Sequence, residues 1–187
     1  MLTVYFSATG NTQYCAKRFA KNMDAVCYSI ENDIDFAALF AQHEQIAFFY
    51  PIFGSHIPRI MREFVVKHKA NLINKKIIIF CSQMLFSGDG ARVFVDLLED
   101  IDFQVIYAEH IKMPNNLVNV PIFPVKNGED LQDILLKANE KIDQACNNIN
   151  NGIVIKRGFN TFSKHLGLWA SGCISLRWRR MQSMLFG

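Results

Sequence analysis

Five short runs of apolar residues, almost without alternating polar positions, constrain the fold of this chain more than any other feature. They span residues 2–6, 25–29, 46–50, 76–81 and 103–108. Residues 46–50 and 77–80 are hydrophobic without interruption. Runs of this kind are typical of strands that are covered on both faces, as in a parallel sheet flanked by helices.

The segments between these runs carry apolar residues at helical spacing. Residues 11–22, 58–66, 91–98 and 130–149 repeat them three or four positions apart, which predicts one apolar stripe per helix. Strands that alternate with helices predict an α/β fold, a doubly wound parallel sheet with helices on both faces. In such a sheet, ligands bind beyond the carboxyl ends of the strands, where the strand order reverses.

The chain divides at residues 147–152, where asparagines and a glycine predict the end of the last helix and a boundary. We therefore expect one domain over residues 1–152 and a C-terminal extension over residues 153–187. The extension holds six basic residues and no acid, which leaves 14 basic and 17 acidic residues, a net charge of −3, in residues 1–152. A nucleic-acid-binding protein would spread basic and aromatic residues over its folded face, so we expect no nucleic acid partner.

The extension is too apolar for a linker. We interpret it as a segment that packs on the body of the protein or on a neighbouring domain. The alternative is a basic amphipathic helix that lies on a membrane or on an acidic partner.

Five cysteines, an odd number at wide spacing and never in a CxxC pair, argue against a disulfide framework, a zinc site or a cluster ligand set. The first strand follows Met1 directly, with no pattern of a signal peptide, and no apolar run reaches the length of a membrane span. We therefore expect a reducing, cytoplasmic compartment.

The first predicted ligand loop follows the first strand and combines hydroxyl and amide side chains with a glycine, and with no cation or acid. Its polar members and glycine are Ser7, Thr9, Gly10, Asn11 and Thr12. Such side chains, with the free N–H groups of a helix N-terminus, can surround a phosphate monoester. The loop matches neither GxxxxGK[ST] nor GxGxxG, which disfavours nucleoside triphosphates and dinucleotides. The alternative is that these residues only cap the helix.

The string Ser-x-Thr-Gly-Asn-Thr after an N-terminal strand resembles the FMN phosphate loop of flavodoxins. The resemblance extends to residues 50–58 and 81–90, and covers roughly residues 1–150. The sequences of the three loops are most similar to those in the flavodoxin-like half of certain bacterial proteins. In these proteins such a domain precedes a ferredoxin-like segment that carries iron–sulfur clusters. That segment is not part of this sequence. The resemblance implies a flavodoxin-like fold, five parallel strands in the order 2-1-3-4-5, with noncovalently bound FMN.

The resemblance also implies which residues contact FMN, through three loops. Phe53 offers a planar apolar surface to the flavin ring, and the peptide of Gly54 would reorient when the flavin is reduced. In the third loop, Gly88 and Gly90 permit unusual backbone angles that present N–H groups to the pyrimidine edge. The implied contacts are Ser7, Thr9, Gly10, Asn11, Thr12, Pro51, Ile52, Phe53, Gly54, Ser82, Gln83, Met84, Phe86, Gly88 and Asp89.

Other residues near these loops have simpler interpretations. His56 could meet a substrate, but an exposed loop histidine fits equally. Cys81 could be redox active, but a small core residue fits better. Asn116 could close over the flavin, and a simple turn explains it as well. The scattered histidines have no metal-ligand spacing.

These features predict an electron-transfer flavoprotein that shuttles electrons between redox partners, with a ferredoxin-like iron–sulfur protein as the expected partner. One alternative is an FMN-dependent NAD(P)H:quinone-type oxidoreductase, in which hydride reaches the flavin directly. Another is a non-redox interaction module with a flavodoxin fold.

Overall fold

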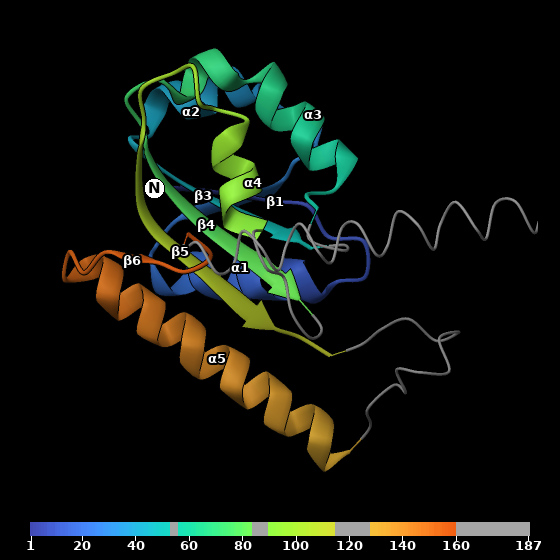
Figure 1. Cartoon of the computed structure of the whole chain (residues 1–187). Helices are drawn as coiled ribbons and strands as arrows, with labels where there is room; N and C mark the ends of the chain where they lie inside the picture. Colours follow the sequence, from blue (N-terminus) through green and yellow to red (C-terminus); the bar gives the residue numbers. More distant parts are fainter. Residues whose placement is uncertain (53–55, 84–89, 115–127, 160–187) are drawn as a thin grey trace, which may run out of the picture.

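The computed structural model describes residues 1–52, 56–83, 90–114 and 128–159, which form a parallel sheet with helices on both faces (Figure 1). Six strands are ordered β2-β1-β3-β4-β5-β6, and all neighbouring pairs are parallel. The strands are β1 Leu2–Tyr5, β2 Val26–Ser29, β3 Gln45–Pro51, β4 Lys76–Gln83, β5 Gln104–Lys112 and β6 Ile155–Lys156. The strand order reverses at β1, which has β2 on one side and β3 on the other, so the predicted fold class is confirmed.

The sheet has six strands rather than the five expected, because residues after position 152 add a short strand at its edge. In β6, Ile155 pairs with Tyr107 and Lys156 pairs with Ala108 of β5. The Arg157 N–H continues this contact by donating to the Ala108 carbonyl at 3.0 Å. A two-residue strand is too short to produce a readable alternation, although apolar residues at 153–155 give a weak signal.

Helices cover the two faces of the sheet unequally. One face carries α2 Phe36–Gln42, α3 Arg59–Lys67, the short 3-10 helix η1 Lys69–Leu72 and α4 Gly90–Asp96, and the other carries α1 Asn11–Asn22 and α5 Glu129–Asn150 (Figure 1). Phe48 packs on Phe94 of α4 with ring centroids 4.7 Å apart, while its neighbour Phe49 stacks on Phe80 at 4.5 Å on the opposite face. Since successive side chains of a strand point to opposite faces, both faces need apolar residues. This explains the uninterrupted runs.

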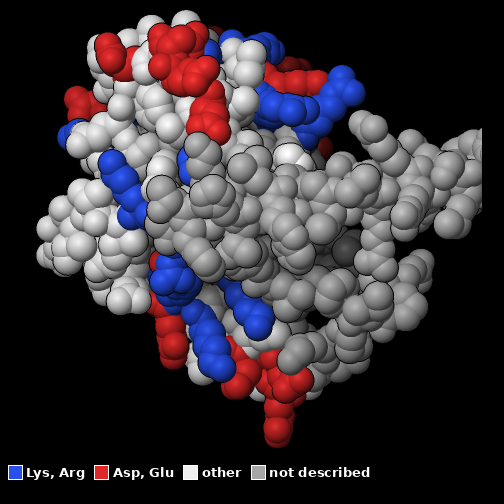
Figure 2. Space-filling view, in the orientation of Figure 1, with Lys and Arg blue, Asp and Glu red and all other residues white. Residues whose placement is uncertain are grey.

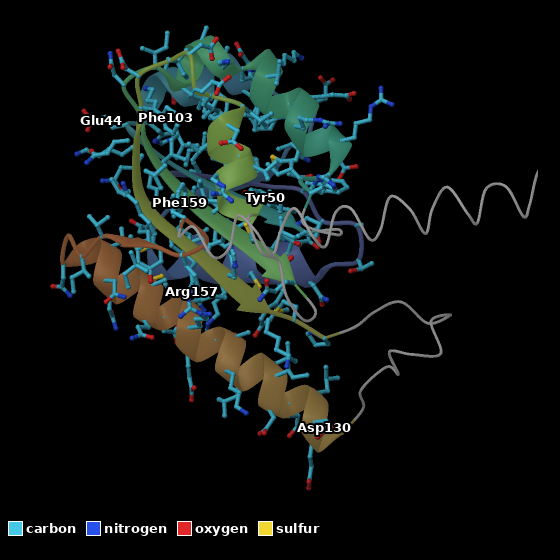
Figure 3. The ribbon with its side chains drawn as sticks, viewed as in Figure 1. Glu44, Tyr50, Phe103, Asp130, Arg157 and Phe159 are labelled. Carbon is cyan, nitrogen blue, oxygen red and sulfur yellow. The ribbon has the colours of Figure 1, made fainter. Side chains whose placement is uncertain are left out.

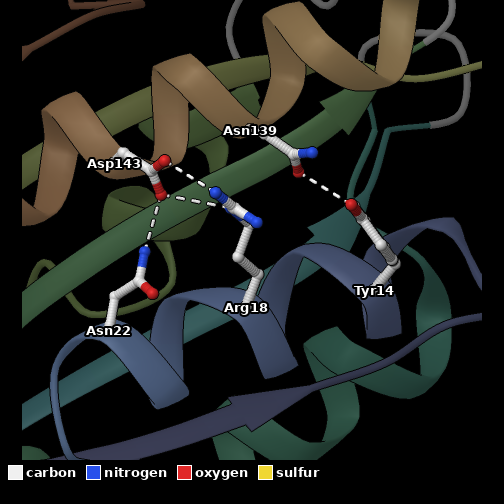
Figure 4. Close-up of polar contacts among 5 residues, drawn as sticks. All are labelled: Tyr14, Arg18, Asn22, Asn139 and Asp143. Carbon is white, nitrogen blue, oxygen red and sulfur yellow. Dashed lines mark hydrogen bonds and ion pairs between the residues drawn. The ribbon is translucent and has the colours of Figure 1, made fainter. Parts of the chain in front are cut away.

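The two helices that share one face are tied together by polar contacts (Figure 4). Arg18 of α1 makes a bidentate pair with Asp143 of α5, with distances of 2.6 and 3.1 Å. Asn22 adds a bond of 2.6 Å to the same carboxylate, and Tyr14 donates to the Asn139 side chain at 2.8 Å. Hydrogen bonding to Arg18 lowers the pKa of Asp143. These contacts join α1 to α5, two helices that lie far apart in the sequence.

All four predicted helices begin and end within two residues of their observed bounds. The sequence reading gave no range for α2, which has only seven residues. Its start has a recognisable cap, because the Asp35 side chain accepts a hydrogen bond from the Ala38 N–H at 3.0 Å. A short helix leaves too few repeats for a periodic signal, and only the capping residue could have located it.

Charges of both signs share the visible surface. Figure 2 shows acidic side chains at the top and bottom of the view, with basic side chains between them and at the right. Within the part of the chain that the structure describes, no helix is long and apolar enough to cross a membrane.

Candidate functional site

The first loop leads from β1 into α1 and leaves the helix N-terminus uncapped by any side chain. Gly10 occupies the N-cap position with a φ of +90°, a left-handed conformation that favours glycine. The first turn of α1 contains no acidic residue. A Cβ on Gly10 would meet no heavy atom of the described residues within 4 Å. The Ser7 hydroxyl accepts a bond from the Gly10 N–H at 3.1 Å, which stabilises the turn.

The first two residues of α1 are held by neighbouring strands. The Asn11 side chain donates to the carbonyl of Pro114, just after β5, at 2.8 Å. The Thr12 hydroxyl lies 2.7 Å from the Ser82 hydroxyl near the end of β4. Thr12 and Ser82 are buried, with exposed fractions of 1% and 6%. The predicted phosphate loop is therefore joined to two other strand ends.

The ends of β3, β4 and β5 are joined in the same way. The Ile52 N–H donates to the Ser82 carbonyl at 2.9 Å, and the Met113 N–H donates to the Gln83 carbonyl at 2.8 Å. Pro51 is the last residue of β3 and pairs with Ser82. The sheet thus brings together the described members of all three predicted loops.

Six of the predicted FMN contacts lie outside the described residues. They are Phe53, Gly54, Met84, Phe86, Gly88 and Asp89. Asn116 also lies outside them. Their expected contacts with the flavin ring stay predictions.

Gly90 does not have the unusual backbone angle expected of it, and its role is one of close packing. It is the first residue of α4. Its φ is not positive, unlike that of Gly10 at the start of α1. A Cβ there would lie 2.6 and 2.8 Å from side-chain carbons of Ile52 and 3.1 Å from the Cys81 sulfur. The buried Tyr50 hydroxyl donates to the Gly90 carbonyl at 2.9 Å (Figure 3 labels Tyr50). Glycine at this position leaves room for the Ile52 and Cys81 side chains, which pack against the start of α4.

Cys81 behaves as a core residue. It is fully buried, and burial raises the pKa of its thiol to about 12. Burial also raises the pKa of the adjacent Tyr50 well above its ordinary value. Both side chains therefore stay neutral near pH 7. His56 lies exposed on the surface, as its loop interpretation expected.

Sequence reasoning missed a polar cluster on β5, at Glu109 and His110. The buried Glu109 carboxylate lies 3.1 Å from Lys141 of α5 and 3.2 Å from Arg157, and accepts the His110 N–H at 2.7 Å (Figure 3 labels Arg157). His110 pairs with Cys81 on β4, and burial lowers its pKa to about 4. A Glu-His pair inside an otherwise apolar strand was the available signal.

Among the described residues, no group of three or more histidine, cysteine, aspartate or glutamate side chains could hold a metal ion. The donor set instead fits FMN. An uncapped helix N-terminus without acids favours a phosphate. In addition, the Gln83 side-chain oxygen at the end of β4 is buried and has no hydrogen-bond partner among the described residues. A buried acceptor without a donor is costly, and a flavin imide N–H is a donor that could satisfy it.

Solved structures similar to this chain are flavodoxin-like. The two-electron reduced flavodoxin of Megasphaera elsdenii has a TM-score of 0.53 and 19% identity, over 75% of this chain and 99% of that one. Flavodoxin 1 of Bacillus cereus has a TM-score of 0.53 and 16% identity, over 78% and 93% of the two chains. A WrbA-like flavodoxin from Agrobacterium tumefaciens has a TM-score of 0.51 and 17% identity, over 81% and 97%. At these identities the likeness concerns the fold.

A search of curated proteins found no match. A family model described as a flavodoxin domain matches residues 2–120, which is more than half of the chain and includes all three predicted loops. Membership of this family is consistent with three features of the structure: the strand order, the uncapped start of α1 and the convergence of the loops at one edge of the sheet. The chain belongs to the flavodoxin domain family and is an FMN-binding, flavodoxin-like protein.

Proposed function

We propose that this protein carries electrons between redox proteins, with a ferredoxin-like iron–sulfur protein as one partner. The single observation that carries the proposal is the uncapped N-terminus of α1, whose first residues are hydrogen bonded to the ends of β4 and β5. Bound FMN supplies the redox chemistry, because it takes up and releases electrons one or two at a time.

The chain's own residues would hold the phosphate without a cation. The first N–H groups of a helix have no carbonyl partner within the helix, and they point along its dipole toward the space before Gly10. We assign further contacts to the side chains of Ser7, Thr9 and Thr12. Because the loop holds no lysine or arginine, hydrogen bonds and the helix dipole must provide the attraction.

In this proposal the flavin ring of FMN contacts the second and third loops. We place the flavin ring against Pro51, Ile52, Phe53 and Gly54, and its pyrimidine edge near Gln83. The unpartnered Gln83 side-chain oxygen supports this assignment. We assign the remaining contacts to Met84, Phe86, Gly88 and Asp89.

A carrier fits the ionisable groups near the site better than an enzyme with its own nucleophile. Cys81 and Tyr50 are buried and neutral near pH 7, so neither supplies a thiolate or phenolate for covalent chemistry. The four described cysteines are all free, which supports a reducing compartment such as the cytoplasm.

We retain residues 1–152 as the FMN-binding domain and residues 153–187 as a basic extension. Residues 155 and 156 pair with β5 as strand β6, which supports packing of the extension on the body of the protein. The ferredoxin-like partner is supported by the resemblance to flavodoxin–ferredoxin fusion proteins. We expect no nucleic acid partner, and we favour contact of the extension with protein over contact with a membrane.

The test of this function is an anaerobic reductive titration of the purified protein, monitored by its visible spectrum. We expect an FMN spectrum that bleaches rapidly with reduced ferredoxin and slowly with NADPH. Rapid bleaching by NADPH alone would instead favour an NAD(P)H:quinone-type oxidoreductase. A protein that takes up no FMN would refute the proposed function and favour an interaction module.

Binding measurements test the phosphate assignment separately. Riboflavin lacks the phosphate, so it should bind far more weakly than FMN in a fluorescence titration. The Thr9→Ala variant should weaken FMN binding by about 1–3 kcal/mol and leave riboflavin binding unchanged. Equal affinities for FMN and riboflavin in the wild type would contradict the assignment.

A further inference from the structure

Two hydroxyl groups that are far apart in the sequence are hydrogen bonded to each other at the start of α1. Thr12 is the second residue of α1, and Ser82 lies next to the end of β4. Their oxygen atoms are 2.7 Å apart, and either can be the donor. Both residues are more than nine-tenths buried. The pair is therefore sheltered from water.

The pair has one hydroxyl proton more than its mutual hydrogen bond uses. Each hydroxyl carries one proton and can also accept hydrogen bonds. The bond between Thr12 and Ser82 uses only one of the two protons. In residues 1–52, 56–83, 90–114 and 128–159, neither hydroxyl has a second hydrogen-bond partner. A buried donor without an acceptor costs free energy, so the site favours an acceptor that arrives from outside the chain.

The surroundings of Thr12 determine what kind of acceptor fits. Thr12 lies in the first turn of α1, where the N–H groups and the helix dipole favour an anion. No acidic side chain in this turn repels an anion, and no heavy atom of the described residues lies within 4 Å of a Cβ placed on Gly10. An anion that accepts the Thr12 proton selects one orientation of the pair: Ser82 donates to Thr12, and Thr12 donates to the anion.

We propose that Ser82 is a positioning residue for the phosphate of FMN and acts through the Thr12 hydroxyl. This inference rests on the proposed FMN site, and it adds a role for a residue on a different strand from the phosphate loop. The resemblance to flavodoxins places Ser82 in the third loop, which is expected at the flavin ring. Its hydroxyl instead faces α1, on the phosphate side of the site.

A double-mutant cycle tests the relay, using FMN and riboflavin titrations of apoprotein. We expect Thr12→Val to raise the FMN dissociation constant about tenfold and Ser82→Ala about fivefold, with riboflavin changed less than about twofold. Because Ser82 acts through Thr12, Ser82→Ala should have no further effect when Thr12 is already valine. Thr12→Ser keeps the hydroxyl and should keep wild-type affinity.

A flavin-free measurement provides a second test. Inorganic phosphate should raise the Tm of the apoprotein more than chloride at equal ionic strength, and this difference should shrink in Ser82→Ala. The matched control is Ser29→Ala, since the Ser29 side chain bonds only within its own exposed turn. This control should behave as the wild type in both assays.

The outcomes separate this inference from the proposed function. If the wild type binds FMN no better than riboflavin, the phosphate site itself is wrong. If the wild type prefers FMN but Ser82→Ala weakens both ligands equally, or adds fully to Thr12→Val, Ser82 only braces the fold and the relay is refuted. Should Ser82→Ala fail to fold, Ser82→Cys has similar volume and a weak donor, and it must show the same selective loss for FMN.

Discussion

Glu109 should contribute more to stability than any exposed carboxylate of the protein. Its side chain is 8% exposed and lies between Lys141 of α5 and Arg157, just after β6. It also accepts the His110 N–H at 2.7 Å. The Glu109→Gln change keeps the size of the side chain and one oxygen, but removes the charge that faces two cations.

The magnitude follows from the burial of the three partners. Breaking a fully buried ion pair costs about 3–5 kcal/mol, whereas exposed pairs contribute about 0–1 kcal/mol. Lys141 is 30% exposed and Arg157 is 59% exposed, so water screens part of each interaction. We therefore expect Glu109→Gln to lower the free energy of unfolding by about 2 kcal/mol. For a chain of this size, that corresponds to a Tm about 4–8 °C lower.

Urea unfolding monitored by circular dichroism gives this free energy directly. Glu140→Gln on the exposed surface of α5 is the matched control and should change it by less than about 0.5 kcal/mol. Double-mutant cycles with Lys141→Met and Arg157→Met should give a larger coupling to Lys141, the less exposed cation. A Glu109→Gln variant as stable as the control would show that desolvation cancels the attraction, and the reasoning would fail.

Three further predictions concern single buried positions. Thr3 is fully buried and its hydroxyl has no hydrogen-bond partner in the part of the chain that the structure describes, so Thr3→Val should raise the free energy of unfolding by about 1 kcal/mol in urea titrations; a loss would reveal a partner for the hydroxyl. Gly90→Ala should lower it by about 1–3 kcal/mol, because the new methyl group would lie 2.6 Å from Ile52, and an unchanged urea midpoint would mean that Ile52 moves freely. His110 has a folded-state pKa lowered to about 4, so the unfolded chain binds its proton first as the pH falls. The wild type should therefore lose about 1.4 kcal/mol per pH unit between pH 6.5 and 4 relative to His110→Phe, and parallel pH profiles of the two proteins would exclude this titration.

The fold could be predicted from the sequence because its strongest signals are local. Strands buried on both faces leave uninterrupted apolar runs, and the long helix α5 leaves several turns of periodic residues. The short elements α2 and β6 span too few residues for either pattern. For α2, the Asp35 cap was the available sign.

The candidate site was only partly predictable, for a related reason. The loop from Ser7 to Thr12 is contiguous, so its residues and spacing could be recognised directly. The bond between Thr12 and Ser82 joins residues 70 positions apart, and no local pattern records such a pairing. Gly90 shows the same limit: its position marked a loop, and only the structure shows that Ile52 and Cys81 pack against it.

The contacts between α1 and α5 also set an order of events during synthesis. Arg18 and Asp143 are separated by 125 positions, so this face of α1 has no partner until α5 has left the ribosome. Closing so long a loop is slow, and until it closes the outer face of α1 and the sheet beside it lack the cover of α5. We expect that a nascent chain ending before Glu129 cannot retain FMN, and that adding α5 as a separate peptide restores binding. Cofactor loading would then follow the synthesis of α5 rather than precede it.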